Sequence, residues 1–198
     1  PMAARSIKTN SFGGATPQTR NVISGNGVDG IRVQNAVSGC TIQGNYVGTN
    51  PAGTAAIGNS SILAPSAGIE ANGSNIIVGG AAAGQRNVIS GNADMGVRLS
   101  GTLNQLVGNT IGMAANGTSP LGNAGAGVFV SSLFGGSNLP IGGVGAGKGN
   151  LIAHNGGVGV AMDALAGEGV PMLGNSIFAN GGLGIDLGNN GVTSNDAS

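Results

Sequence analysis

Seven carboxylates are the side chains of this sequence best suited to metal binding or acid–base catalysis. Calcium takes about six to eight oxygen ligands, so a calcium site needs several carboxylates close together. The carboxylates of this chain are scattered and form no dense cluster, so we predict no metal site and no cofactor. They are Asp29, Glu70, Asp94, Asp163, Glu168, Asp186 and Asp196.

Nucleophilic catalysis has fewer candidate residues still. The chain has one histidine, His154, and one cysteine, Cys40, which excludes an internal disulfide. A Ser-His-Asp arrangement needs a histidine held between a nucleophile and a carboxylate, and one histidine among scattered serines is no such signal. His154 stands where sister repeats have Gly25 and Gly91, which favours a corner substitution over a catalytic role. We therefore predict no catalytic residues and lean towards a protein that is not an enzyme.

A charged column is the first candidate surface site. Arg32, Glu70 and Arg98 occupy the same outward position in three consecutive repeats. If the repeats stack, these side chains form a ladder whose ion pairs contribute about 0.2–1 kcal/mol each. This structural interpretation is favoured, and a site for a sugar acid or another substrate is the alternative.

An apolar column is the second candidate surface site. Its residues would form an exposed stripe for binding or assembly, unless a bend in the chain or a terminal segment buries them. They are Phe12, Val78, Val107, Ile141 and Leu173.

Both columns depend on a repeat that runs through the chain. The segment Asn21-Val-Ile-Ser-Gly-Asn26 returns at 87–92 and, in altered form, at 150–155, offsets of 66 and 63 residues. Gly-Gly pairs at 13–14, 79–80 and 142–143 precede the three copies. A Gly followed by Ile or Val recurs twice as often, so each unit holds two turns of about 28 to 35 residues. These glycines are Gly30, Gly68, Gly96, Gly127, Gly159 and Gly184.

Each turn contains three short apolar segments with the two-residue period of strands, separated by Gly and Asn. The first segments centre on Phe12, Ile42, Ile77, Leu106, Ile141 and Met172. The second centre on Ile23, Val47, Ile89, Ile111, Ile152 and Ile177, and the third on Ile31, Ile69, Val97, Val128, Val160 and Ile185. This layout predicts an all-β, single-domain parallel β-helix over 1–198, with about six coils of three short strands. The expected coils are 9–39, 40–73, 74–102, 103–136, 137–168 and 169–190, with a tail at 191–198.

Stacking places equivalent side chains above one another, about 4.8 Å apart. Aliphatic columns would then form the core, and corner asparagines would turn inward as hydrogen-bonded ladders. The corner residues are Asn26, Asn45, Asn92, Asn109, Asn155 and Asn175. Two similar insertions, 48–59 and 112–123, should project side by side from one flank, with no purpose indicated by their sequence.

Composition excludes several classes of function. Charged residues make up 7% of the chain and the net charge is zero, so nucleic acid is not an expected partner. No apolar run is long enough to span a membrane. Gly accounts for 42 of 198 residues, and these glycines recur in register with the apolar segments instead of forming a low-complexity tract.

These motifs resemble the right-handed parallel β-helix repeat family, the pectate-lyase-like solenoids, over roughly residues 9–190. The resemblance rests on Asn-Val-Ile-Ser-Gly-Asn, on Ile-Gly-Gly and on the segment Gly184-Ile-Asp-Leu-Gly-Asn-Asn190. Gly/Asn-rich repeats of large secreted bacterial proteins look most similar, which implies a secreted or cell-surface location. Because the family holds lyases, hydrolases, epimerases, tailspikes and adhesins, the resemblance indicates fold more than activity.

The expected function is a non-catalytic extracellular structural or adhesive module. Neither end has an evident polar cap, which solenoids normally need, and open sheet edges pair with other strands. The expected partner is a second copy stacked end to end into a fibre, or the continuation of a longer chain. The alternative is a β-helix protein that binds or cleaves extracellular polysaccharide, as a lyase or hydrolase would. Ice binding ranks last because no strand face carries an ordered rank of threonines.

Overall fold

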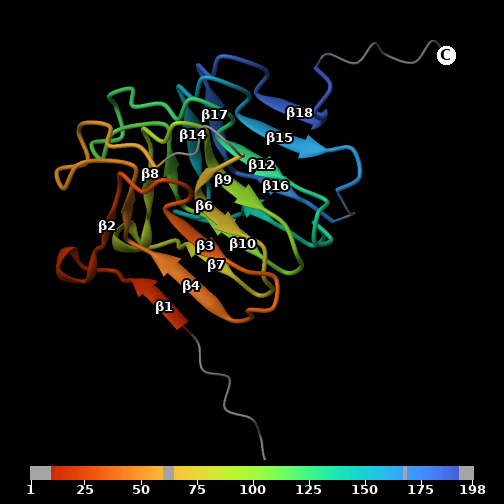
Figure 1. The fold of residues 1–198 in the computed structure, drawn as a ribbon, viewed down its shortest axis with the longest axis horizontal. Helices are drawn as coiled ribbons and strands as arrows, with labels where there is room; N and C mark the ends of the chain where they lie inside the picture. Colours follow the sequence, from red (N-terminus) through yellow and green to blue (C-terminus); the bar gives the residue numbers. More distant parts are fainter. Residues whose placement is uncertain (1–9, 60–64, 167–168, 192–198) are drawn as a thin grey trace, which may run out of the picture.

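A computed structural model describes residues 10–59, 65–166 and 169–191. Its strands form three sheets of six, and neighbouring strands in each sheet run parallel. Two short 3-10 helices, η1 (Pro17–Thr19) and η2 (Ala83–Gln85), are the helical elements of these residues. Figure 1 shows the coils following one another in sequence order, from the red first coil to the blue last coil. The predicted all-β parallel β-helix of about six coils is confirmed.

Each coil contributes one strand to each sheet, so the chain passes through the first, second and third sheets and then repeats. The first sheet contains β1 (Asn10–Gly13), β4 (Cys40–Gln43), β7 (Ile77–Gly79), β10 (Gln105–Val107), β13 (Ile141–Gly142) and β16 (Met172–Leu173). The second contains β2 (Val22–Ile23), β5 (Tyr46–Val47), β8 (Val88–Ile89), β11 (Thr110–Ile111), β14 (Leu151–Ala153) and β17 (Ser176–Phe178). The third contains β3 (Ile31–Val33), β6 (Ala67–Ala71), β9 (Met95–Leu99), β12 (Val128–Val130), β15 (Val160–Asp163) and β18 (Ile185–Gly188).

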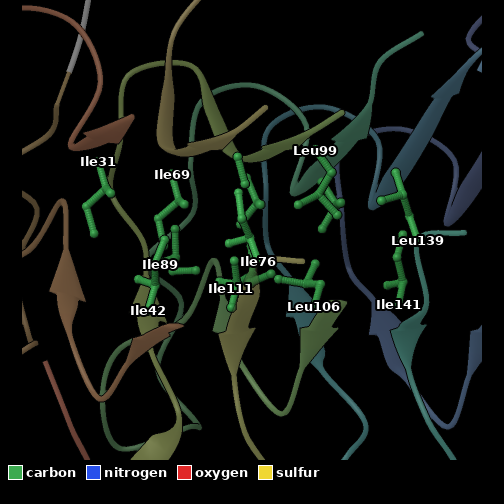
Figure 2. Packing of buried hydrophobic residues seen from close by; sticks show 14 of the residues in the cluster. Ile31, Ile42, Ile69, Ile76, Ile89, Leu99, Leu106, Ile111, Leu139 and Ile141 are labelled. Carbon is green, nitrogen blue, oxygen red and sulfur yellow. The ribbon is translucent and has the colours of Figure 1, made fainter. Parts of the chain in front are cut away.

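The core consists of aliphatic columns that run along the axis, as Figure 2 shows. The predicted column of the second sheet is correct at every coil and runs from Ile23 to Ile177. The predicted column of the third sheet, from Ile31 to Ile185, is also correct. Branched side chains suit this stacked, pleated surface, and those of the interior coils are fully buried.

The predicted column of the first sheet is wrong at one coil. Val78, not Ile77, pairs with Ile42 and Leu106 and is fully buried. A shift of one residue exchanges the two faces of a strand. The register is fixed by Gly79, which has a positive φ of 90° at the corner that ends the strand.

The predicted asparagine ladders are confirmed. There are two of them, one at each corner of the second sheet, whereas the sequence prediction gave one corner asparagine for each coil. Each asparagine donates from its backbone N and its Nδ2 to the Oδ1 of the next one along the axis. The ladder before the second sheet consists of Asn21, Asn45, Asn87, Asn109, Asn150 and Asn175. The ladder after it consists of Asn26, Asn59, Asn92, Asn123, Asn155 and Asn180.

The ladders satisfy polar groups that the corners would otherwise leave buried and unpaired. Nδ2 of Asn109, for example, also donates to the carbonyl oxygen of Val78 at 2.9 Å. The ladder needs glycine beside it, because a Cβ at Gly112, where φ is 88°, would overlap the Ala153 carbonyl and the Asn155 side chain. The corners therefore combine a left-handed backbone with an amide that bonds along the axis.

The two insertions lie side by side, as predicted. The backbone N of Ala115 in the second insertion donates to the carbonyl oxygen of Gly53 in the first at 2.9 Å. Asn50 and Asn116 each accept backbone N–H groups within their own loop. No helix within the described ranges is long and apolar enough to cross a membrane.

Candidate functional site

The outer face of the third sheet holds the charged ladder predicted from the sequence. Arg32, Glu70 and Arg98 sit at paired positions of β3, β6 and β9. Glu70 lies between the two arginines, with Oε2 2.6 Å from Nε of Arg32 and Oε1 3.0 Å from Nη1 of Arg98. Its side chain is only 7% exposed, against 47% for Arg32 and 19% for Arg98.

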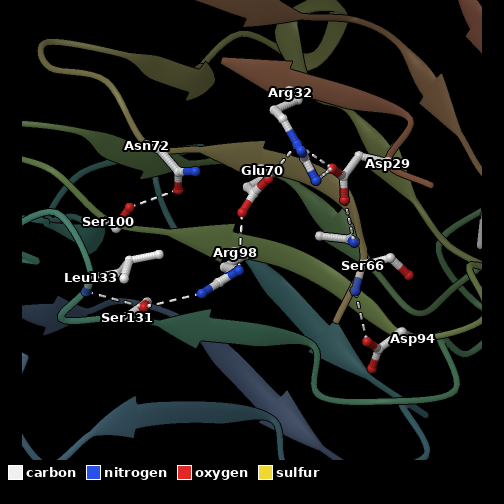
Figure 3. Close-up of polar contacts among 11 residues, drawn as sticks. Asp29, Arg32, Ser66, Glu70, Asn72, Asp94, Arg98, Ser100, Ser131 and Leu133 are labelled. Carbon is white, nitrogen blue, oxygen red and sulfur yellow. Dashed lines mark hydrogen bonds and ion pairs between the residues drawn. The ribbon is translucent and has the colours of Figure 1, made fainter. Parts of the chain in front are cut away.

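Asp29 is a fourth member of this charged ladder, and the sequence prediction missed it. Its Oδ2 lies 2.6 Å from Nη2 of Arg32, and its Oδ1 accepts the backbone N of Ala67 at 2.8 Å (Figure 3). Burial opposes the charge of Arg32, but its hydrogen bond to Asp29 and its attraction to Asp29 and Glu70 raise the pKa of the guanidinium. The signal was present in the sequence, because Asp29 stands three residues before Arg32 at the start of the strand.

The charges of the ladder alternate in sign and sum to zero. Each carboxylate is already paired with a guanidinium or a backbone N–H group. Such an arrangement cross-links three coils and leaves no surplus charge to attract an ion. Its geometry therefore agrees with the structural interpretation of the column.

Arg98 differs from the other members because one of its groups lacks a partner. Nη1 bonds Glu70 and Nη2 donates to the hydroxyl of Ser131 at 3.4 Å. Nε is buried and, among the described residues, has no hydrogen-bond partner. A buried donor without an acceptor costs about 1–3 kcal/mol.

A cleft of about 520 Å³ lies over this part of the sheet. Its floor is polar, and exposed apolar side chains of the segment after β12 form one wall. Asn72 lies at the floor, where its Oδ1 accepts the hydroxyl of Ser100 at 2.7 Å. The lining residues are Arg32, Gln34, Asn35, Pro65, Glu70, Asn72, Arg98, Leu133 and Phe134.

The predicted apolar stripe does not exist as an exposed surface. Val78 and Ile141 are fully buried, and Phe12 belongs to the same inward column, uncovered only because it lies in the first coil. The residues that directly follow this inward column include one glutamine and three glycines, of which Gly79 and Gly142 are buried. They are Gly13, Gln43, Gly79, Val107, Gly142 and Leu173.

The other chemically capable side chains lie apart from one another. His154 has a positive φ of 59° at a corner and packs edge-on against Phe178, with ring centroids 5.9 Å apart. Hydrogen bonds from the backbone N of Leu165 and from the hydroxyl of Ser132 lower the pKa of Asp163. Cys40 is buried as a free thiol. Among the described residues, no three His, Cys, Asp or Glu side chains gather where they could hold a metal ion.

The two end coils form the second surface of interest. Apolar side chains that would be buried in an interior coil are partly exposed there, including Phe12 and Val22 in the first coil. In the last coil Ile185 is 45% and Leu187 64% exposed, and both line a hollow of about 600 Å³. The ends of all three sheets coincide at these two coils, since β1, β2 and β3 are at one edge and β16, β17 and β18 at the other.

Comparison with protein-family models, curated proteins and solved structures finds no match to the chain.

Proposed function

We propose that this chain is a non-catalytic extracellular structural module that assembles through its two end coils. The observation that carries this proposal is the continuity of the core: aliphatic columns and two asparagine ladders run through every described coil. At the ends, the same columns and sheet edges have no covering coil among the described residues.

Open sheet edges and exposed apolar columns favour association, because both groups gain partners when another coil covers them. A secreted or cell-surface location is part of the proposal and rests on the resemblance of the repeats to those of large secreted bacterial proteins. A pectate-lyase-like ancestry is proposed on the same basis, and the fold by itself assigns no activity.

Light scattering over a range of protein concentrations tests the proposal directly. The mean mass should rise with concentration, and electron microscopy should show rods longer than one chain. Six coils at about 4.8 Å give an axial repeat of roughly 29 Å per copy. A chain that stays monomeric at every concentration would contradict the proposal.

Polysaccharide binding is a second candidate function, favoured by the cleft beside Arg98. The cleft combines hydrogen-bonding groups with the exposed apolar side chains of Leu133 and Phe134, a mixture that suits a sugar ring. Calorimetry against a panel of acidic and neutral oligosaccharides tests it. Binding should be lost in Phe134→Ala and kept in Leu103→Ala, a control at an exposed leucine outside the cleft lining.

A further inference from the structure

We propose that a row of basic side chains, on the loops between the first and second sheets, binds a linear polyanion along the axis of the solenoid. This basic row consists of Arg20, Arg86 and Lys148. It is separate from the charged ladder and from the cleft, so the inference goes beyond the proposed structural function and does not depend on it. The ligand is a chain that repeats phosphate, sulfate or carboxylate groups, to which guanidinium and ammonium groups bind.

The two-coil repeat sets the spacing of the basic row. Arg20 and Arg86 directly precede Asn21 and Asn87, two members of one asparagine ladder that are two coils apart. Coils stack about 4.8 Å apart, so the two arginines lie about 10 Å apart along the axis. Lys148 follows after two further coils, in the loop before β14. The row therefore has the period of the repeat itself.

The loops that carry the basic row are stacked directly on one another. A Cβ at Gly84 in the second loop would overlap the carbonyl oxygen of Ala15 in the first. A Cβ at Gly147 in the third loop would likewise overlap the carbonyl oxygen of Ala81 in the second. Such close contact leaves the loops little room to move, so the basic groups keep their spacing. The loops span 14–21, 80–87 and 143–150.

Contacts with the second sheet hold both arginines in place. Nε of Arg20 donates to the carbonyl oxygen of Gly44 at 3.2 Å, and its Cζ lies 4.1 Å from the centroid of the Tyr46 ring. Nη1 of Arg86 donates to the hydroxyl of Thr110 at 3.3 Å. Within the described ranges the other guanidinium nitrogens have no acceptor, and none of them is fully buried. The two groups are therefore oriented in advance and keep donors for a ligand, which lowers the cost of ordering them on binding.

The acidic side chains lie elsewhere, so the basic row keeps its charge. Lys148 is exposed, and in the described part of the chain neither it nor the two arginines of the row forms an ion pair. Every described carboxylate lies in a strand of the third sheet or in the turn before one. These carboxylates are Asp29, Glu70, Asp94, Asp163 and Asp186. Unlike the charged ladder, the row has positive charges left over to attract an anion.

A linear ligand suits the basic row better than a compact one. The charges lie one after another along the axis, and the cleft and the hollow described above are lined by other residues. A small anion could contact only one basic group, because the next is about 10 Å away. A chain can contact all three at once, and each further contact is then made at a high effective concentration.

Titration of dilute protein into labelled dextran sulfate, polyphosphate and alginate at low salt tests the proposal, with fluorescence anisotropy as the readout. The wild type should bind, and the polymer bound most tightly identifies the anionic group. Arg20→Gln, Arg86→Gln and Lys148→Gln should each weaken binding about fivefold, and the triple variant should not bind. Added salt should weaken binding, because a polyanion releases counterions when its charges are neutralised.

Arg32→Gln is the matched control, because it removes the same charge from the charged ladder. Arg86→Lys keeps the charge of the basic row and should keep most of the binding. Equal weakening by Arg32→Gln and Lys148→Gln would overturn the proposal, as would a wild type that binds none of the polymers or binds only single-stranded DNA. Because these measurements use dilute protein, they hold whether or not copies of the chain assemble, so the structural function can fail separately.

Discussion

Interior coils and end coils of this solenoid use the same residue types and differ in what their polar groups meet. Asn87 and Asn109 are fully buried, and each both accepts from one neighbouring amide and donates to the next. Asn21 in the first coil is exposed and donates to Asn45, and no described residue donates to the side-chain oxygen of Asn21. The contribution of a ladder asparagine is therefore set by whether coils lie on both of its sides.

Removing an interior ladder member should have the largest effect. Asn109→Ala leaves N and Nδ2 of Asn87 without their acceptor and the Val78 carbonyl without its amide donor. Unfolding free energy in urea, measured on dilute protein, should fall by about 4 kcal/mol, since each buried unsatisfied group costs about 1–3 kcal/mol. Asn21→Ala is the matched control and should lose less than about 1 kcal/mol. Equal losses at the two positions would contradict the comparison.

Truncating one isoleucine of an aliphatic column, either in an interior coil or in the last coil, should give the next largest difference in the free energy of unfolding. Ile111 and Ile177 belong to the same second-sheet column, but Ile111 is fully buried and Ile177 lies half-buried in the last coil. Ile111→Ala should cost about 3–4 kcal/mol through lost burial and a residual cavity. Ile177→Ala should cost about half of that, because solvent fills the space. A larger loss at Ile177 would show that the last coil is covered in solution.

Removing the central charge of the charged ladder should lower the free energy of unfolding by a smaller amount. Glu70→Gln keeps the shape of the side chain and removes the charge between Arg32 and Arg98. Because the carboxylate is buried while both arginines keep some exposure, the loss should be about 2 kcal/mol, below the range for a fully buried pair. Added salt should change the wild type more than the variant. A variant as stable as the wild type would mean that the ion pairs contribute nothing net.

Sequence reasoning placed the second and third strands of every coil correctly because each has a fixed marker. The third strand follows a glycine and the second stands inside Asn-Val-Ile-Ser-Gly-Asn or its variants. The first strand of coil three offers Ile76, Ile77 and Val78 in a row, so hydropathy alone allows two registers. The Gly-Gly pair at 79–80, aligned with the pair at 13–14, would have chosen the correct one.

Some of the candidate sites could also be predicted from the sequence, and others could not. The charged ladder was predictable because like positions of adjacent coils pair directly. Asparagine ladders were predicted correctly but with one corner asparagine for each coil, although the repeated motif begins and ends with asparagine and so marks both corners of the second sheet. Neither the cleft nor the unpaired Nε of Arg98 could be foreseen, because both depend on where the segment after β12 folds over the sheet.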